Sequence, residues 1–237
     1  MINGLSNALS GFKTASKKIE TGANNIANVQ TPGFKASRAE SVSIESGGSK
    51  VSSITRSSSQ DSLVSTSNPL DLAISGNGLF QITNSAEGNY FSHGGSFKQD
   101  ANGRLTNSNG KPLTPEIQIP ANAKNISISQ TGEVSSVIDD RSQNLGQIEL
   151  ASFSNSAELS AEGNNLFGES AASLTPVTGN PRTGEFGSIQ SGFLEGSNVD
   201  IASEVVAQIA DVVAFKANAQ VIKAIDEATG SILDIKG

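Results

Sequence analysis

The chain has 237 residues, a formal net charge of -7, one histidine and no cysteine. The acidic balance disfavours nucleic-acid binding, which needs a basic surface to displace counterions from phosphates. The lack of cysteine excludes disulfides, thiolate metal sites and cysteine nucleophiles.

Residues 1 to 29 carry a narrow apolar stripe whose members follow one another in alternating steps of three and four. The stripe consists of Ile2, Leu5, Leu9, Phe12, Ile19, Ala23 and Ile26, with Ser16 completing the register. This spacing is typical of a coiled-coil seam and predicts a helix that ends before Pro32. Gly4, Gly11 and Gly22 lie inside it, and each costs about 1 kcal/mol relative to alanine. We therefore expect the helix to be stable only when it is packed.

Residues 36 to 68 are rich in serine, with only scattered apolar residues, and predict an extended connector. Short alternations at 42–44 and 51–54 allow brief extended segments. From 69 to 190 the pattern changes to period two with frequent turns, which is typical of many short strands. This region is predicted to be an all-β domain.

Residues 199 to 235 are predicted to form a second helix, with Asn198 or Asp200 as its N-cap. Its apolar stripe consists of Val205, Ile209, Val212, Phe215, Ala219, Ile222 and Ile225. Three lysines and one glutamate give residues 2–29 a net charge of +2. Six acidic residues and two lysines give residues 200–235 a net charge of -4. Opposite charge favours pairing of the two helices, within one subunit or between subunits.

The predicted fold class is therefore α+β, with paired terminal coiled-coil helices around a central all-β domain. We expect the helical regions at 1–35 and 191–237, the connector at 36–68 and the β domain at 69–190. No basic segment followed by an apolar core opens the sequence, and no continuous run of about 18 apolar residues occurs. A cleaved secretory signal and a membrane-inserted segment are therefore not expected.

A search for chemistry finds little. His93 lies in a glycine-containing segment that predicts a surface turn, although any Ser–His–Asp or metal–histidine site would have to use it. Gly76 and Gly78 lead into a strand instead of a helix, so they do not form a dinucleotide-binding loop. The adjacent Asp139 and Asp140 predict a turn. The sequence therefore predicts no catalytic residue, cofactor or metal.

Two motifs near the helix boundaries resemble the signature of bacterial flagellar rod and hook proteins, the axial family. They comprise Asn24, Asn25, Asn28, Pro32, Gly33 and Phe34 after the first stripe, and Gly192, Glu195, Ser197 and Asn198 before the second. Segments 68–80 and 95–105 resemble the β domain of the family, and 119–123 resembles its distal-rod version. The asparagines allow two interpretations: they bond backbone groups where the helix ends, or they bind neighbouring subunits.

The resemblance implies a structural subunit that polymerises with itself and with other rod and hook proteins into a torque-transmitting helical tube. It also implies export, without signal cleavage, through the flagellar type III apparatus to the periplasm-spanning basal body. A distal-rod-like member is favoured, while a proximal-rod protein or a short hook subunit stays open because the connector is short. An alternative from another class is a β-rich surface hydrolase or adhesin, the hydrolase using His93.

Overall fold

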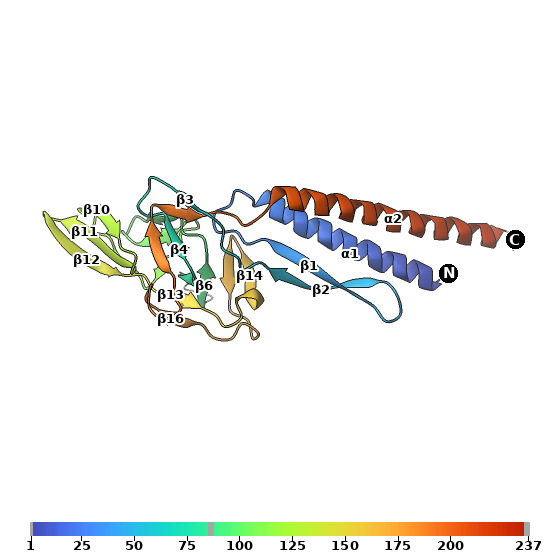
Figure 1. Cartoon of the computed structure of the whole chain (residues 1–237), viewed down its shortest axis with the longest axis horizontal. Helices are drawn as coiled ribbons and strands as arrows, with labels where there is room; N and C mark the ends of the chain where they lie inside the picture. Colours follow the sequence, from blue (N-terminus) through green and yellow to red (C-terminus); the bar gives the residue numbers. More distant parts are fainter. Residues whose placement is uncertain (1, 85–87, 235–237) are drawn as a thin grey trace. The chain divides into compact units, whose positions relative to one another are not determined.

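The computed structural model describes residues 2–84 and 88–234, without the side chains of Ile2, Asn84 and residues 232–234. These residues form two compact units. The helical unit comprises Met1–Val29, Lys35–Ser57 and Val199–Gly237, and the β unit comprises Gln30–Phe34 and Ser58–Asn198. Figure 1 shows both units coloured along the sequence.

The helical unit contains helices α1 (Ile2–Ala27) and α2 (Ile201–Asp234), so both helices predicted from the apolar stripes are confirmed. They run antiparallel: Gly4 of α1 lies opposite Ile225 of α2, and Gly22 lies opposite Gln208. Asp200 is the N-cap of α2, since its Oδ1 accepts hydrogen bonds from the backbone N–H groups of Ala202 (2.9 Å) and Ser203 (3.2 Å). These N–H groups, that of Ser203 first, hold the pKa of the Asp200 carboxyl below its usual value.

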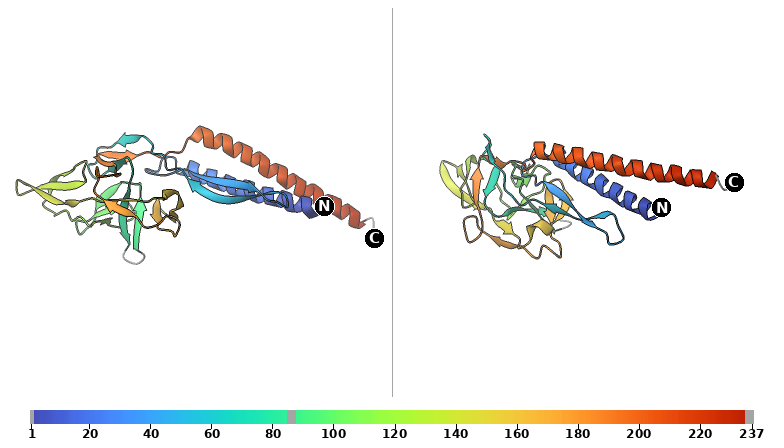
Figure 2. Two further views of the ribbon diagram at one scale, coloured as in Figure 1. Left: turned by 60° about the horizontal axis from the view of Figure 1, so that its bottom comes forward. Right: turned by 45° about the vertical axis from the view of Figure 1, so that its right-hand side comes forward.

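The third element of the helical unit is an antiparallel hairpin of strands β1 (Ser37–Ser43) and β2 (Ser49–Arg56). It packs along α1, so α1 lies between this hairpin and α2 (Figures 1 and 2). The Thr14 hydroxyl donates to the Ser49 carbonyl (3.1 Å), and the Ser49 N–H donates to Ser10 Oγ (3.1 Å). The segment expected to be an extended connector thus contains two regular strands, held to α1 largely by polar contacts.

By length and composition alone, Ile201–Ser231 is apolar enough to cross a membrane. No such span is expected from the sequence, because charged residues interrupt every long apolar run. The difference arises because alanine, valine and isoleucine occur on nearly all sides of α2, whereas its charges are few and widely spaced. This distribution leaves α2 with much more apolar surface than α1 alone covers.

The β unit confirms the predicted central β region. Its elements in chain order are β3 (Leu63–Ser65), β4 (Leu72–Ser75), β5 (Leu79–Asn84), β6 (Gly88–Ser92), β7 (Phe97–Gln99), β8 (Leu105–Asn107), β9 (Leu113–Thr114), β10 (Lys124–Ile128), β11 (Glu133–Ile138), β12 (Arg141–Gln147), β13 (Leu150–Ser152), the 3-10 turn η1 (Ser156–Glu158), β14 (Ser160–Gly163), β15 (Leu166–Gly168), β16 (Val177–Gly179), β17 (Ser188–Ser191) and β18 (Phe193–Glu195). The largest sheet has the order β14-β15-β6-β5-β13-β16, with β9 also paired to β5. Strands β10, β11 and β12 form a separate three-stranded sheet, and three further pairs are β17-β4, β18-β3 and β7-β8.

A continuous apolar core joins these sheets. Phe80 and Phe97 meet edge to face at a centroid distance of 5.1 Å, and Leu72, Ile82 and Leu150 are fully buried around them. Phe80 and Ile82 of β5 thus point into this core, whereas Leu79, one residue before Phe80, belongs to a second, smaller apolar cluster with Phe91 and Phe153. The alternation along β5 places its apolar residues on opposite faces of the sheet, as expected for a strand.

The turns occur where the sequence places them. Gly103 takes a φ of +82° in the turn between β7 and β8, and Asp139 and Asp140 take φ values of 51° and 59° between β11 and β12. Positive φ at both central residues of a two-residue hairpin loop matches the twist of the flanking strands. Asp139 and Asp140 therefore have a structural role in a turn.

Candidate assembly surface

Small residues on α1 line part of its contact with α2. A methyl group added to Gly11 would lie 2.7 Å from Asn218 Oδ1, and one added to Gly22 would lie 3.2 Å from Gln208 Oε1. Ala8 and Ala15, on the same side of the helix as Gly11, are the two most buried apolar residues of α1. The glycines that weaken the helix in isolation therefore allow α2 to approach closely. The cost of these glycines can be read from the sequence, whereas their role in close packing becomes visible only in the structure.

Aromatic packing joins the middle of the two helices. The rings of Phe12 and Phe215 lie with their centroids 4.2 Å apart. This contact is the clearest case in which the two predicted stripes meet each other within one chain. It lies on the edge of the small-residue surface, one residue from Gly11.

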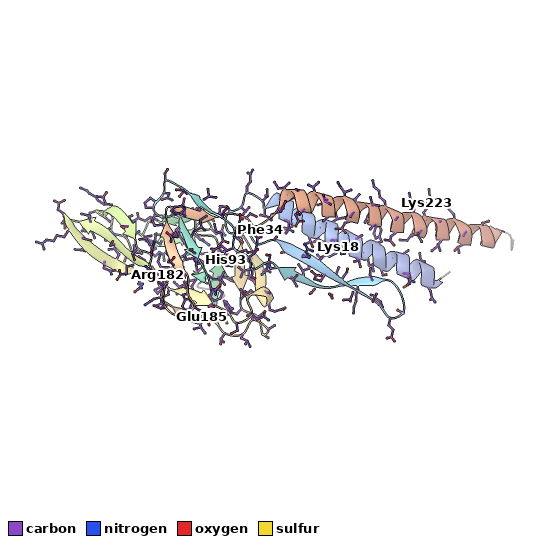
Figure 3. All side chains as sticks on the ribbon, viewed as in Figure 1. Lys18, Phe34, His93, Arg182, Glu185 and Lys223 are labelled. Atoms are coloured by element: carbon purple, nitrogen blue, oxygen red, sulfur yellow. The ribbon has the colours of Figure 1, made fainter. Side chains whose placement is uncertain are left out.

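The helix pair has a polar end where α1 finishes and α2 begins. Asn25 Nδ2 donates to Glu204 Oε1 (3.0 Å) across the two helices. Burial raises the pKa of the Asp211 carboxyl above its usual value, and the positive charge of Lys18 opposes this rise. Figure 3 labels Lys18 on α1. The complementary charges predicted for the two helices thus meet here.

The structure divides the predicted seam into two groups. Members that are partly buried in the helical unit are Phe12, Ile19, Ile26, Val212, Phe215, Ile222 and Ile225. Members that are exposed are Leu5 (40%), Leu9 (43%), Val205 (42%) and Ile209 (61%). The side chain of Ile2 lies outside the described part of the chain. Their role as a polymerisation surface stays a prediction.

Asn25 connects all three elements of the helical unit. It is 1% exposed, its Nδ2 donates to the Ser37 carbonyl (2.8 Å), and its Oδ1 accepts from the Ser37 N–H (2.9 Å). The Asn28 side chain donates to the Asn24 carbonyl (2.9 Å), while Asn24 itself is exposed. Asn25 and Asn28 therefore bond backbone groups within the chain, and exposed Asn24 is left for the second interpretation, contact with a neighbour.

Within the β unit, the two family motifs meet although they are far apart in the sequence. The Gly33 N–H donates to the Glu195 carbonyl (2.9 Å), and the Asn198 N–H donates to the Phe34 carbonyl (3.3 Å). A side chain at Gly33, where φ is +68°, would overlap the backbone at His93. Pro32 contributes a carbonyl that accepts from Asn165 Nδ2 (3.1 Å). These residues thus position the loop that follows α1.

The later motif binds the start of the β unit in the same way. Gly192 donates its N–H to the Asp71 carbonyl (2.8 Å) and accepts from the Thr66 N–H (2.6 Å). Asn198 Nδ2 donates to the Ser59 carbonyl (2.9 Å). The Ser197 hydroxyl is buried and makes no hydrogen bond within the described residues.

His93 faces a carboxylate instead of a nucleophile. Its Nδ1 lies 3.9 Å from Oε2 of Glu195, a side chain that is 2% exposed. The adjacent Ser92 hydroxyl is buried, donates to the Asn165 carbonyl (2.9 Å) and accepts from the Gly94 N–H (3.0 Å). Ser92 is therefore held in place by backbone groups and does not serve as an activated nucleophile. Among residues 2–84 and 88–234, no group of three or more acidic or histidine side chains could hold a metal ion.

Comparison with known families gives three matches along the chain. Residues 5–35 match the flagella basal body rod protein family. Residues 73–136 match the D1 domain of the flagellar hook proteins FlgE, FlgF and FlgG, and residues 190–235 match the C-terminal region of the FlgEFG basal body rod proteins.

Individual relatives match over nearly the full length. The flagellar basal-body rod protein FlgG of Bacillus subtilis is 34% identical, and the alignment covers 100% of both chains. The chain belongs to the flagellar basal-body rod and hook protein family. Rod proteins FlgG of Agrobacterium fabrum (34% identity; 93% of this chain and 94% of the relative) and Borreliella burgdorferi (34%; 100% and 99%) agree. The hook protein FlgE of Escherichia coli is 37% identical over 53% of this chain and 35% of its own length.

Family membership confirms the resemblance drawn from the motifs. Rod and hook proteins are structural proteins of the flagellum, so this member of the family is not an enzyme. The hydrolase alternative that used His93 is therefore set aside.

Proposed function

We propose that the chain is a subunit of the flagellar rod, in its distal part, that polymerises into a torque-transmitting tube. The observation that carries this proposal is the alignment with rod proteins FlgG over 93–100% of the chain. The hook relative aligns over only 53% of the chain, which favours a rod subunit over a short hook subunit. Other flagellar rod and hook proteins would adjoin it at the ends of such a polymer.

The helical unit supplies the physical basis for assembly. Among the side chains of α1 and α2 that the structure describes, eight large apolar ones are at least 40% exposed, namely Leu5, Leu9, Ile201, Val205, Val206, Ile209, Val213 and Val221. Large apolar side chains exposed in this number favour a protein–protein interface on the helices. We propose that the pair is a coiled coil, since the α1-facing positions of α2 recur in steps of four and three from Glu204 to Ile225.

The proposal extends to transport and location. A rod subunit works outside the inner membrane, and we infer that it leaves the cell interior uncleaved through the flagellar type III export apparatus. Fusing a fast-folding, stable domain to either end should block export, whereas fusing a short epitope should not.

Assembly itself is tested with the purified full chain. Sedimentation velocity and electron microscopy at rising concentration should reveal elongated polymers with a regular helical repeat. A protein that stays monomeric at millimolar concentration, with intact helical circular dichroism, would contradict the proposal.

A further inference from the structure

Helix α1 has three sides, and two of them are covered within the chain. The side with Gly11 meets α2, and the side with Thr14 meets the β1–β2 hairpin. The third side carries Leu5 and Leu9, which are 40% and 43% exposed. The two leucines are four positions apart in the sequence, so they lie one above the other on the helix. We call this surface, defined by Leu5 and Leu9, the leucine face.

Helix α2 has a larger open side opposite the residues that meet α1. Val206, Ile209 and Val213 are 68%, 61% and 62% exposed there. Between Ile201 and Phe215 the only charged residues of α2 are Glu204 and Asp211. Both lie on the side that faces α1, so the open side carries no charge over about four turns. We call the surface of Val206, Ile209 and Val213 the valine face.

Beyond Ile225, the described side chains of α2 are exposed as well. Gly4 near the start of α1 lies opposite Ile225, yet α2 continues to Asp234. Only Ile2 and Asn3 of α1 precede Gly4 in the described residues, so most of the last nine residues of α2, which span about 14 Å of helix, extend beyond α1. Residues 226–231 are all exposed, and a methyl group added to Gly230 would contact nothing. We expect a helix end that extends in this way to contact another molecule.

We propose that the leucine face of one subunit packs on the valine face of a second copy of this chain. The proposal rests on the proposed function and adds which surface meets which: the small residues of α1 serve the contact within a subunit, and the leucines serve the contact between subunits. Because the two faces differ, the contact is heterologous, and repeated heterologous contacts produce an open helical filament. A valine face packing on its own copy would instead close a dimer and end growth.

The dimensions agree with this contact. Leu5 and Leu9 lie about 6 Å apart along α1, and Val206 and Val213 lie about 11 Å apart along α2, so each face is one to two helical turns long. Faces of this length cover much less than the roughly 800 Å² that each partner contributes to a standard stable interface. A single contact is therefore weak, and stability comes from each subunit making several, as in a polymer.

The test uses two full-length variants that each destroy one face. Leu9→Asp removes the leucine face and Val213→Asp removes the valine face. Val64→Asp is the matched control, because Val64 is a similarly exposed valine (55%) in the β unit. We expect each face variant to raise the concentration needed for assembly at least tenfold with unchanged helical circular dichroism, and the control to assemble as wild type. If Leu9→Asp loses helix, Leu9→Ser repeats the test with a milder change.

Mixing the two face variants gives the decisive result. The first keeps an intact valine face and the second keeps an intact leucine face, so at the millimolar concentration that a single weak contact requires they should form one-to-one dimers that do not grow. If the wild type polymerises but the mixture of the two variants forms no dimers, the proposed pairing is overturned and the proposed function stays intact. A wild-type chain that never assembles would instead overturn the proposed function. Flotation of the wild type with phospholipid vesicles, lost in Val213→Asp, would assign the valine face to a membrane and also overturn the pairing.

Discussion

The packing of α1 on α2 through glycine makes a prediction that opposes ordinary helix propensity. Replacing an interior helix glycine normally stabilises a helix, by about 1 kcal/mol for alanine and a few tenths for valine. At Gly11, however, an added Cβ would lie 2.7 Å from Asn218 Oδ1 and 3.0 Å from its Cγ. We expect Gly11→Val to lower the free energy of unfolding of the helical unit.

The magnitude follows from competing effects. Inserting methyl groups into a packed contact costs about 1–3 kcal/mol. The Asn218 side chain can rotate away only by giving up its hydrogen bond to the Ala214 carbonyl (2.8 Å), which lies at the surface and costs well under about 1 kcal/mol. Against these, valine gains a few tenths of a kcal/mol in propensity. Because Asn218 can move, the steric cost lies at the low end of its range, and the net loss is about 0.5–1 kcal/mol.

Gly4→Ala is the matched control within the same helix. Its new methyl group would lie 3.7 Å from Ile225 Cδ1, an ordinary contact. We expect this variant to gain up to about 1 kcal/mol. Urea unfolding followed by helical circular dichroism, at a concentration where sedimentation finds monomers, compares the two. If Gly11→Val unfolds at the same urea concentration as wild type or at a higher one, α2 does not need a glycine at position 11 in order to pack on α1.

Three further changes test other contacts. Asn25→Ala removes both hydrogen bonds to Ser37 and should destabilise the helical unit by about 2–3 kcal/mol. The hairpin should then be cleaved faster by a protease, and an unchanged cleavage rate would show that Asn25 does not hold the hairpin to α1. Asp211→Asn should flatten the pH dependence of the melting temperature. The pKa of Asp211 is raised on folding, so the native state binds the proton more tightly and stability increases as pH falls through the folded-state pKa, levelling off below the unfolded value. Gly95→Ala, whose methyl group would overlap the Leu72 carbonyl oxygen, should lower the unfolding midpoint of the β unit and leave the helical signal unchanged.

The long elements could be predicted because their signals are local. Apolar periodicity, a capping aspartate and a Pro–Gly break define α1 and α2 within two or three residues. Turn residues such as Asp139 and Asp140 define hairpins for the same reason, since their backbone preferences act over a few residues. These features need no knowledge of the rest of the chain.

The β1–β2 hairpin could not be predicted as a regular element from its own sequence. Its strands are rich in serine, and their partner is the polar side of α1, where Ser10, Thr14 and Asn25 bond the hairpin backbone. An apolar-pattern rule does not detect a strand that packs through hydrogen bonds. The sequence predicts that Asn25 bonds a backbone group near the end of α1, and the structure shows that this group belongs to Ser37, at the start of the hairpin.

The division of the helix surfaces was also hidden from the sequence. A stripe of large apolar residues indicates which surface of a helix packs on a partner. It does not indicate whether that partner belongs to the same chain. In α2 apolar residues occur on nearly every side, so periodicity cannot select a face. Small residues carry no signal on a hydrophobic scale, although Gly11 and Gly22 mark the inner contact.

The polar side chains between the helices explain how one chain can keep its own pair distinct from its neighbours. Asn25 bonds Glu204, Lys18 lies near Asp211, and Gln208 lies over Gly22. Sliding α2 by one turn, about 5.4 Å, would separate these partners and leave partly buried charge uncompensated, which is costly. Apolar surfaces tolerate such slides far better, because their attraction has no direction. The polar end therefore fixes the register inside the subunit, and the uncharged faces are left free to meet other copies.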